Sequence, residues 1–174
     1  MRHLICLGVA SSVLLASPPA KAGDFDDCWD KTGQAAVGAC SRLIASGSYS
    51  GEALGKIYTA RSFHYLALNN LPAVIDDCNR ALAINARDPV AWQNRSVAKG
   101  RNGDNQGALA DVDQAIRVKP DYYNAFVQRG LLYERLGNLE QARASFRVAA
   151  GAPAIAANQR AIARAREGLG RLGQ

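Results

Sequence analysis

Histidine is scarce in this chain, and its scarcity excludes several kinds of active site. The 174 residues include two histidines, His3 and His64. A Ser-His-Asp or Cys-His arrangement needs a histidine base, and a zinc site needs about four Cys or His ligands. His64 stands between Phe63 and Tyr65 in a helical stretch, where a structural or surface role is favoured over a catalytic one. We therefore expect no enzyme activity, no metal and no cofactor.

Other catalytic patterns are missing as well. The glycines of GRNGDNQG (100–107) follow a helical stretch, and the segment lacks the lysine of a phosphate-binding loop. Paired carboxylates occur at 76–77 and at Asp111 and Asp113. They recur at one place in a repeated pattern, which favours a salt-bridged or solvated helix face over acid–base work.

No apolar run reaches the roughly 20 residues that a membrane-spanning helix needs. The chain begins with a short basic start at 1–3 and a mostly apolar stretch at 4–15, and the Ala-Lys-Ala at 20–22 has the small-x-small pattern that signal peptidase reads. We interpret 1–22 as a signal peptide that is cleaved after Ala22. This predicts a periplasmic or secreted protein, and the alternative is a buried N-terminal helix.

Strong charge of either sign is also missing. Without the leader, 23–174 has the length of one domain, and loss of Arg2 and Lys21 lowers the net charge from +6 to +4. This balance is far weaker than that of typical nucleic-acid-binding domains, so we expect no nucleic-acid partner. The clearest basic stripe lies near the end of the chain, at Arg160, Arg164 and Arg171. Contact of this stripe with anionic lipid or cell-wall polymer stays open.

Cysteines are few, and Cys6 lies in the leader. An oxidising compartment favours a disulfide. Pairing Cys28 with Cys40 would close the loop CWDKTGQAAVGAC and restrain the unfolded chain by about 3 kcal/mol. Cys78 would then remain as a small buried hydrophobe. A Cys40–Cys78 bond is the competing pairing, because both residues would lie on helices of neighbouring units.

What the chain has instead is an internal repeat. Three units of 34 residues follow one another without a gap, at 55–88, 89–122 and 123–156. The fourth position of each unit is aromatic: Tyr58, Trp92 and Phe126. Positions eight, twenty and twenty-seven carry small or short side chains: Ser62, Ser96 and Gly130; Val74, Ala108 and Ala142; Ala81, Ala115 and Ala149. Position fifteen carries residues that tolerate the left-handed conformation at a helix end: Asn69, Gly103 and Gly137. The pattern predicts two short helices per unit, and stacked units bury the face that one unit alone cannot.

This pattern resembles the tetratricopeptide repeat. The resemblance covers 55 to about 153 and is clearest in the third unit, which reads NAFVQRGLLYERLGNLEQARASFRVAA. It is weakest in the first unit, where Cys78 replaces the usual aromatic residue. Exported bacterial repeat proteins are similar in their R-G and A-I motifs. The resemblance implies an all-α, right-handed solenoid of antiparallel helix pairs.

Capping segments are expected at both ends, because terminal units otherwise leave apolar surface in water. The N-terminal segment 23–54 would contain a helix over 34–46 and a looped insertion over 46–52. The C-terminal segment 154–174 would form an amphipathic helix. Its buried side would carry Ile155, Ile162, Leu169 and Leu172.

A further recurrence concerns arginine, which occupies position seven of every unit as Arg61, Arg95 and Arg129. Position twenty-three holds Asp77 and Asp111 in two units and Ser145 in the third. Antiparallel helices bring positions seven and twenty-three side by side. We interpret these residues as pairs that brace each helix hairpin, in preference to a basic ladder for anions. If exposed, each pair contributes ~0–1 kcal/mol.

The resemblance also implies a groove for a peptide or partner helix, lined by the first helix of each unit. Carried over by position, the groove contains Thr59, Phe63, Gln93, Asn94, Val97, Arg101, Asn124, Val127, Gln128 and Leu131. The carboxylate clamp of chaperone-binding members is not expected, because of those positions only Asn94 matches. The apolar position nine (Phe63, Val97, Leu131) either lines this groove or packs between units.

We therefore expect a non-catalytic adaptor or scaffold that binds another protein. A self-associating structural protein and a non-catalytic subunit of an envelope assembly are the alternatives.

Overall fold

The computed structural model describes residues 20–173. In this range the chain forms nine α-helices and one 3₁₀ helix, and no strand. The helices are α1 (Asp24–Asp30), α2 (Gly33–Ala45), α3 (Gly51–Ala67), α4 (Leu71–Ile84), α5 (Pro89–Arg101), α6 (Asn105–Val118), α7 (Tyr123–Arg135), α8 (Leu139–Ala150), η1 (Ala156–Asn158) and α9 (Gln159–Arg171). The all-α prediction is confirmed. Most of the predicted signal peptide lies outside the described residues.

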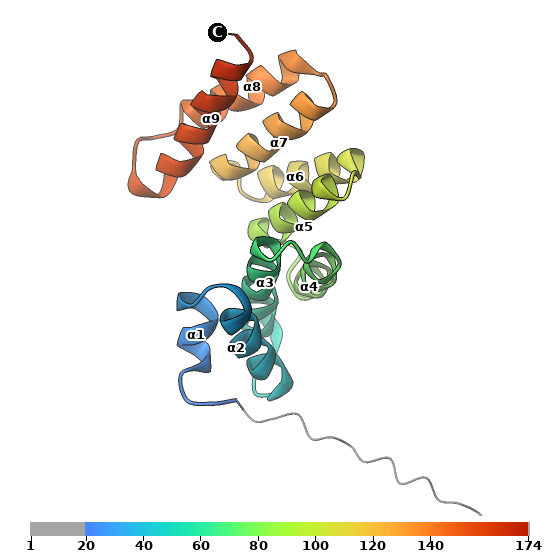
Figure 1. Ribbon diagram of the computed structural model, residues 1–174, viewed down its shortest axis with the longest axis vertical. Helices are drawn as coiled ribbons and strands as arrows, with labels where there is room; N and C mark the ends of the chain where they lie inside the picture. The colour runs from blue at the N-terminus through green and yellow to red at the C-terminus, as the bar shows by residue number, and fades with distance from the viewer. Residues whose placement is uncertain (1–19, 174) are drawn as a thin grey trace, which may run out of the picture.

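Successive helices pack as pairs that stack into an elongated array (Figure 1). Helices α3 and α4, α5 and α6, and α7 and α8 form three similar hairpins. A shorter pair, α1 and α2, stands at one end, and α9 packs on α7 and α8 at the other. This is the solenoid of helix pairs that the repeat predicts.

The array differs from expectation near its N-terminal end. Helix α3 starts at Gly51, inside the stretch 46–52 where the sequence predicts a loop. Its extra first turn is stabilised by Leu54, which packs against the buried cluster that contains Tyr58. Helix α1 is an addition to the prediction, which placed a helix only over 34–46.

The C-terminal helix begins later than expected. Because α9 starts at Gln159, Ile155 lies in the connector before it and is 59% exposed, not on the buried side of a helix. Gly151 ends α8, and Pro153 lacks an N–H group and disfavours helical backbone in the residue before it. The other predicted inward residues, such as Ile162, do pack inward.

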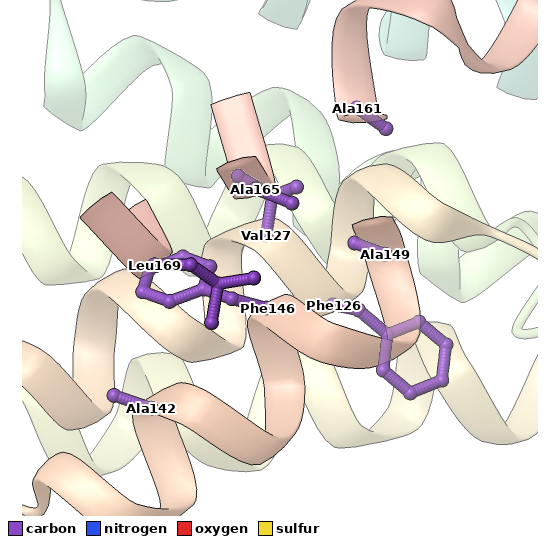
Figure 2. Close-up of a cluster of buried hydrophobic side chains, with 8 residues drawn as sticks. All are labelled: Phe126, Val127, Ala142, Phe146, Ala149, Ala161, Ala165 and Leu169. Carbon is purple, nitrogen blue, oxygen red and sulfur yellow. The ribbon is translucent and has the colours of Figure 1, made fainter. Parts of the chain in front are cut away.

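The core runs along the array at the small positions of the repeat. All six residues at positions twenty and twenty-seven are almost fully buried: Val74, Ala81, Ala108, Ala115, Ala142 and Ala149. At the C-terminal end Phe146 fills the space between α7 and α9 (Figure 2). A Cβ atom at Gly130 would lie 2.5 Å from Phe146 Cε1, and one at Gly168 would lie 2.7 Å from its Cε2. Both positions therefore need glycine.

The hairpin turns follow the prediction. The residues at position fifteen have positive φ angles of 55°, 89° and 76°, at Asn69, Gly103 and Gly137. Asp88 caps α5, since its Oδ1 accepts hydrogen bonds from the N–H groups of Val90 and Ala91.

The arginines at position seven brace the hairpins. Arg61 donates two hydrogen bonds to the carboxylate of Asp77, at 2.8 and 2.7 Å, and Arg95 makes the same contacts to Asp111. In the third hairpin Arg129 donates a hydrogen bond to the hydroxyl of Ser145 and another, 3.2 Å long, to the carboxylate of Asp113, which is partly exposed. The bracing interpretation is confirmed for the first two hairpins. Because Asp77 and Asp111 are buried, the value given for exposed pairs does not apply to them.

Candidate functional site

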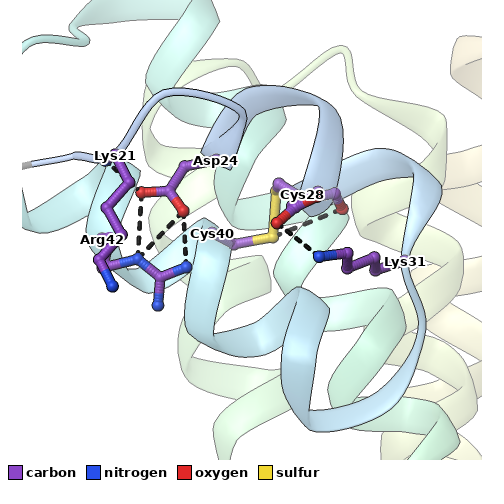
Figure 3. Close-up of polar contacts among 7 residues, drawn as sticks. Lys21, Asp24, Cys28, Lys31, Cys40 and Arg42 are labelled. Atoms are coloured by element: carbon purple, nitrogen blue, oxygen red, sulfur yellow. Dashed lines mark hydrogen bonds and ion pairs between the residues drawn. A yellow bond between two sulfur atoms is a disulfide. The ribbon is translucent and has the colours of Figure 1, made fainter.

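Helix α1 is a short element that is tied to the array at several points (Figure 3). A disulfide joins Cys28 to Cys40 on α2, the pairing that the sequence predicts. The buried carboxylate of Asp24 has both oxygens 3.0 Å from Nε of Arg42, and the hydrogen bonds from this guanidinium lower the pKa of Asp24. From α3, Nε2 of His64 lies 2.9 Å from the Cys28 carbonyl oxygen, so His64 has a structural role.

This tethered helix forms one wall of an open pocket of about 540 Å³, within the usual size range of ligand pockets. The opposite walls are α3 and the turn from α4 into α5. The lining residues are Cys28 and Trp29 from α1; Glu52, Gly55, Lys56, Thr59, Ala60, Phe63 and His64 from α3; and Ala81, Asn85, Arg87, Asp88, Pro89 and Val90 from the turn and its flanking helices.

Large apolar side chains in this pocket remain open to water. Trp29 is 43% exposed, Phe63 54% and Val90 37%, and each comes from a different wall. Phe25 stacks on Trp29 with ring centroids 4.6 Å apart and extends the aromatic surface along α1. An apolar surface that the fold leaves uncovered in a concave site is typical of a binding surface.

The polar groups of the pocket divide into engaged and free ones. Asp88 is engaged, because its Oδ2 accepts from Thr59 Oγ1 at 2.7 Å while its Oδ1 caps α5. Glu52 and Lys56 form an exposed pair at 2.9 Å, which water screens. Arg87 is exposed and has no ion pair within 20–173. The rim therefore offers one free guanidinium and one weakly held ammonium group.

The structure separates the predicted groove residues into three groups. Thr59 and Phe63 line the pocket. Val127 is fully buried in the cluster that also contains Ala161 and Ala165 of α9 (Figure 2), so it belongs to the core and is not available to a partner. The other predicted positions lie along α5 and α7: Gln93, Asn94, Val97, Arg101, Asn124, Gln128 and Leu131.

These remaining positions differ in what they can offer. Asn94 is buried and donates to Ser62 Oγ at 2.9 Å, and Gln128 is buried as well. Arg101 donates to the Leu66 carbonyl oxygen at the end of α3 and so ties neighbouring hairpins together. Partial exposure remains at Gln93, Val97, Asn124 and Leu131. Oε1 of Gln93 is buried without a hydrogen-bond donor in 20–173.

Sequence reasoning missed Trp29, Lys56, Arg87 and Val90. Trp29 lies outside the repeats, Arg87 lies in the turn between α4 and α5, and Val90 lies in the first turn of α5. Repeat positions do not predict that these residues line a pocket. One signal was available for Trp29, an aromatic residue inside the short Cys28–Cys40 loop, where burial by a full helix pair is difficult.

The described residues contain no group of three or more side chains that would hold a metal ion. None of their helices has the length and apolar content for crossing a membrane. Cys78 is a free thiol, fully buried as predicted, and burial raises its pKa to about 12. A thiol with so high a pKa is a poor nucleophile at neutral pH.

Comparison with known proteins links this geometry to one repeat family. The model described as "Tetratricopeptide repeat" matches residues 123–151. Tetratricopeptide repeat protein 36 of Danio rerio is 34% identical over 97 residues, which cover 53% of this chain and 52% of that protein. The chain thus matches about half the length of this curated relative.

Solved structures show the same fold. A thermophilic TPR protein of Thermus thermophilus superposes with a TM-score of 0.63 at 23% identity, over 79% of this chain and 74% of that one. The second TPR domain of human RPAP3, solved in complex with the HSP70 peptide SGPTIEEVD, has a TM-score of 0.59 at 21% identity, over 71% of this chain and 99% of that one.

Proposed function

Because the chain matches the tetratricopeptide repeat model over residues 123–151 and has the fold of such repeats, we propose that it is a non-catalytic module that binds a peptide or helix of another protein. The observation that carries this proposal is the open pocket between α1, α3 and the α4–α5 turn, with Trp29, Phe63 and Val90 left exposed. The RPAP3 domain with the same fold binds a peptide, which supports a binding role for this array.

The pocket suits an apolar side chain of the partner. Burial of an exposed aromatic surface lowers the free energy of binding by about 25 cal/mol per Å² of apolar area. Large aromatic side chains therefore dominate the binding free energy of many interfaces. The engaged carboxylate of Asp88 holds α3 against the α4–α5 turn, so these two walls are formed before a partner arrives. A preformed pocket avoids part of the ordering cost of binding.

From the pocket, the partner segment would continue along α5. There Val97 offers a partly exposed apolar surface, and Gln93 offers a partly exposed polar one. Asn94 is already bonded to Ser62, which further disfavours a carboxylate clamp at that position.

We also propose that the protein is exported. The N-terminal pattern of 1–22 supports this location, and so does the Cys28–Cys40 disulfide, since disulfides persist in oxidising compartments. The test is mass spectrometry of the protein from an envelope or culture fraction. A mature chain that begins at Gly23 is expected, and a chain from that fraction that retains 1–22 would contradict the proposal.

The binding proposal is tested by capture of partners with matched surface variants. Phe63→Asp places a carboxylate in the pocket at a position that is already half exposed, so the fold should survive. Leu139→Asp, at a similarly exposed apolar residue on α8, is the control. We expect the wild type and Leu139→Asp to retain the same specific protein and Phe63→Asp to lose it.

Two outcomes would contradict this assignment. If both variants retain the protein equally, the pocket is not its binding site. If the species retained is a second copy of the chain itself, as light scattering of the purified protein would show, self-association replaces the adaptor function.

A further inference from the structure

The C-terminal end of the array has an unusual charge distribution that the proposed binding site does not use. Residues 141–166 include five arginines and no lysine, aspartate or glutamate. The arginines are Arg143, Arg147, Arg160, Arg164 and Arg166. The whole chain is only moderately basic, so this segment concentrates its positive charge at one end.

Four of these arginines are free to meet a partner. Arg143 is engaged with Glu140 and with the Leu172 carbonyl oxygen. The other four, Arg147, Arg160, Arg164 and Arg166, are exposed and make no ion pair or side-chain hydrogen bond to other residues in 20–173. Arg147 lies in the last turn of α8, and Arg160 lies in the first turn of α9.

An exposed apolar connector lies between these two helix ends. Residues 153–157 read Pro-Ala-Ile-Ala-Ala and are all exposed, with Ile155 at 59%. Val148 on α8, next to Arg147, is 44% exposed. In Figure 1 the connector projects from the stack between α8 and α9. The cations therefore stand on both sides of a protruding apolar loop.

We propose that this end of the array docks on a membrane surface that contains anionic lipid. Arginines near a negatively charged leaflet are attracted to its headgroups, and apolar residues next to them gain by entering the boundary between headgroups and acyl chains. Charge complementarity alone would also suit a nucleic acid. A membrane is favoured because the apolar connector has no use on a phosphate backbone, and because the one aromatic residue of 141–166, Phe146, is buried and cannot stack on a base.

The docking surface is separate from the pocket. The pocket lies at the end formed by α1 to α5, whereas the apolar connector joins α8 to α9 at the opposite end of the stack (Figure 1). A module that docks by its C-terminal end leaves the pocket accessible. Membrane docking and partner binding can therefore be tested separately.

Vesicle flotation with the purified chain tests the proposal. The probes are vesicles of phosphatidylcholine alone and vesicles that also contain phosphatidylglycerol. We expect binding to the second kind only, with loss of binding as salt is raised. Since one basic residue near an anionic surface strengthens binding roughly fivefold, the double variant Arg160→Gln/Arg164→Gln should weaken it by about 25-fold. Ile155→Asp should weaken it as well.

The matched control removes the same charge elsewhere. Arg80→Gln/Arg117→Gln lowers the net charge equally at exposed positions on α4 and α6 and should bind nearly as the wild type does. Three results would overturn the proposal: no flotation with anionic vesicles, an equal loss in both double variants, or tight binding of a DNA duplex that depends on the arginines while Ile155→Asp has no effect on either ligand.

Discussion

The terminal helices at the two ends of the array are attached by different interactions, although the residue that attaches them comes from the same repeat position at both ends. Cys40 on α2 and Phe146 on α8 align at position twenty-four, and both are fully buried. At the N-terminal end Cys40 forms a covalent bond to α1. At the C-terminal end Phe146 fills the space left by Gly130 and Gly168.

The length of the outer helix explains the difference. Helix α1 has seven residues, of which only Asp24 and Cys28 are buried, so it contributes little apolar area. Helix α9 has thirteen residues and buries five of them, including Ile162 and Leu169. A short terminal helix needs a disulfide and an ion pair where a longer one is held by packing. The same comparison explains why the N-terminal end leaves aromatic surface open.

The largest expected effect concerns the packed end. Phe146→Ala leaves a cavity between α7, α8 and α9 that the two glycines cannot fill, and should lower the free energy of unfolding by about 3–5 kcal/mol. Urea denaturation followed by circular dichroism measures it. The control is Val148→Ala, an exposed residue on the same helix, which should change stability by less than about 0.5 kcal/mol. Equal effects would show that Phe146 does not hold the end together.

The next effect concerns the covalent end. Replacing Cys28 and Cys40 together by serine should cost about 3 kcal/mol of the stability of the N-terminal pair. The loss should be local, because α1 has few other buried contacts. Hydrogen exchange is expected to become faster in α1 and α2 and to stay unchanged in α7 to α9. Faster exchange throughout the array would mean that the two ends are not independently held.

A smaller loss of stability is expected when an Arg–Asp pair that braces a hairpin between the two ends is removed. Asp77→Ala leaves the largely buried guanidinium of Arg61 without its carboxylate, and should cost roughly 2 kcal/mol. Arg61 keeps its hydrogen bond to Ser41, which limits the loss. The comparison variant is Asp113→Ala, whose carboxylate is 45% exposed and whose loss should be close to the detection limit in the same urea experiment. A larger loss for Asp113 than for Asp77 would contradict the role assigned to burial.

The smallest effect concerns Cys78, which lies at the same repeat position as Cys40 and Phe146. Cys78 occupies position twenty-four of the first hairpin as a free thiol whose pKa burial raises to about 12. It should therefore react with a thiol reagent at neutral pH only as fast as the chain unfolds, while the unfolded chain reacts at once. Rapid modification of the folded protein would show that this part of the core is open.

Much of the fold was predictable because it depends on local chemistry that repeats every 34 residues. The left-handed turn at Asn69, the Asp88 cap and the Arg61–Asp77 brace each follow from residue type and spacing. The start of α9 was not predictable from periodicity alone. Ile155 continues the apolar spacing of Ile162, but Gly151 and Pro153 interrupt the helix before it.

The candidate site was less predictable, because it depends on contacts that the repeat does not encode. Of the predicted groove, Thr59 and Phe63 reach the pocket, whereas Val127 is covered by α9. Position alone cannot distinguish these residues, since their exposure depends on which helix stacks next. Trp29 enters the site because the disulfide to α2 and the His64 contact from α3 hold α1 beside the pocket.

Hydrogen–deuterium exchange of the complex with the captured partner tests the central claim most directly. The claim is that the open N-terminal end binds and the packed C-terminal end does not take part in that binding. Slower exchange on complex formation is expected in α1, α3 and the α4–α5 turn, with α8 and α9 unchanged. Slower exchange in α7 to α9 with no change around the pocket would contradict it.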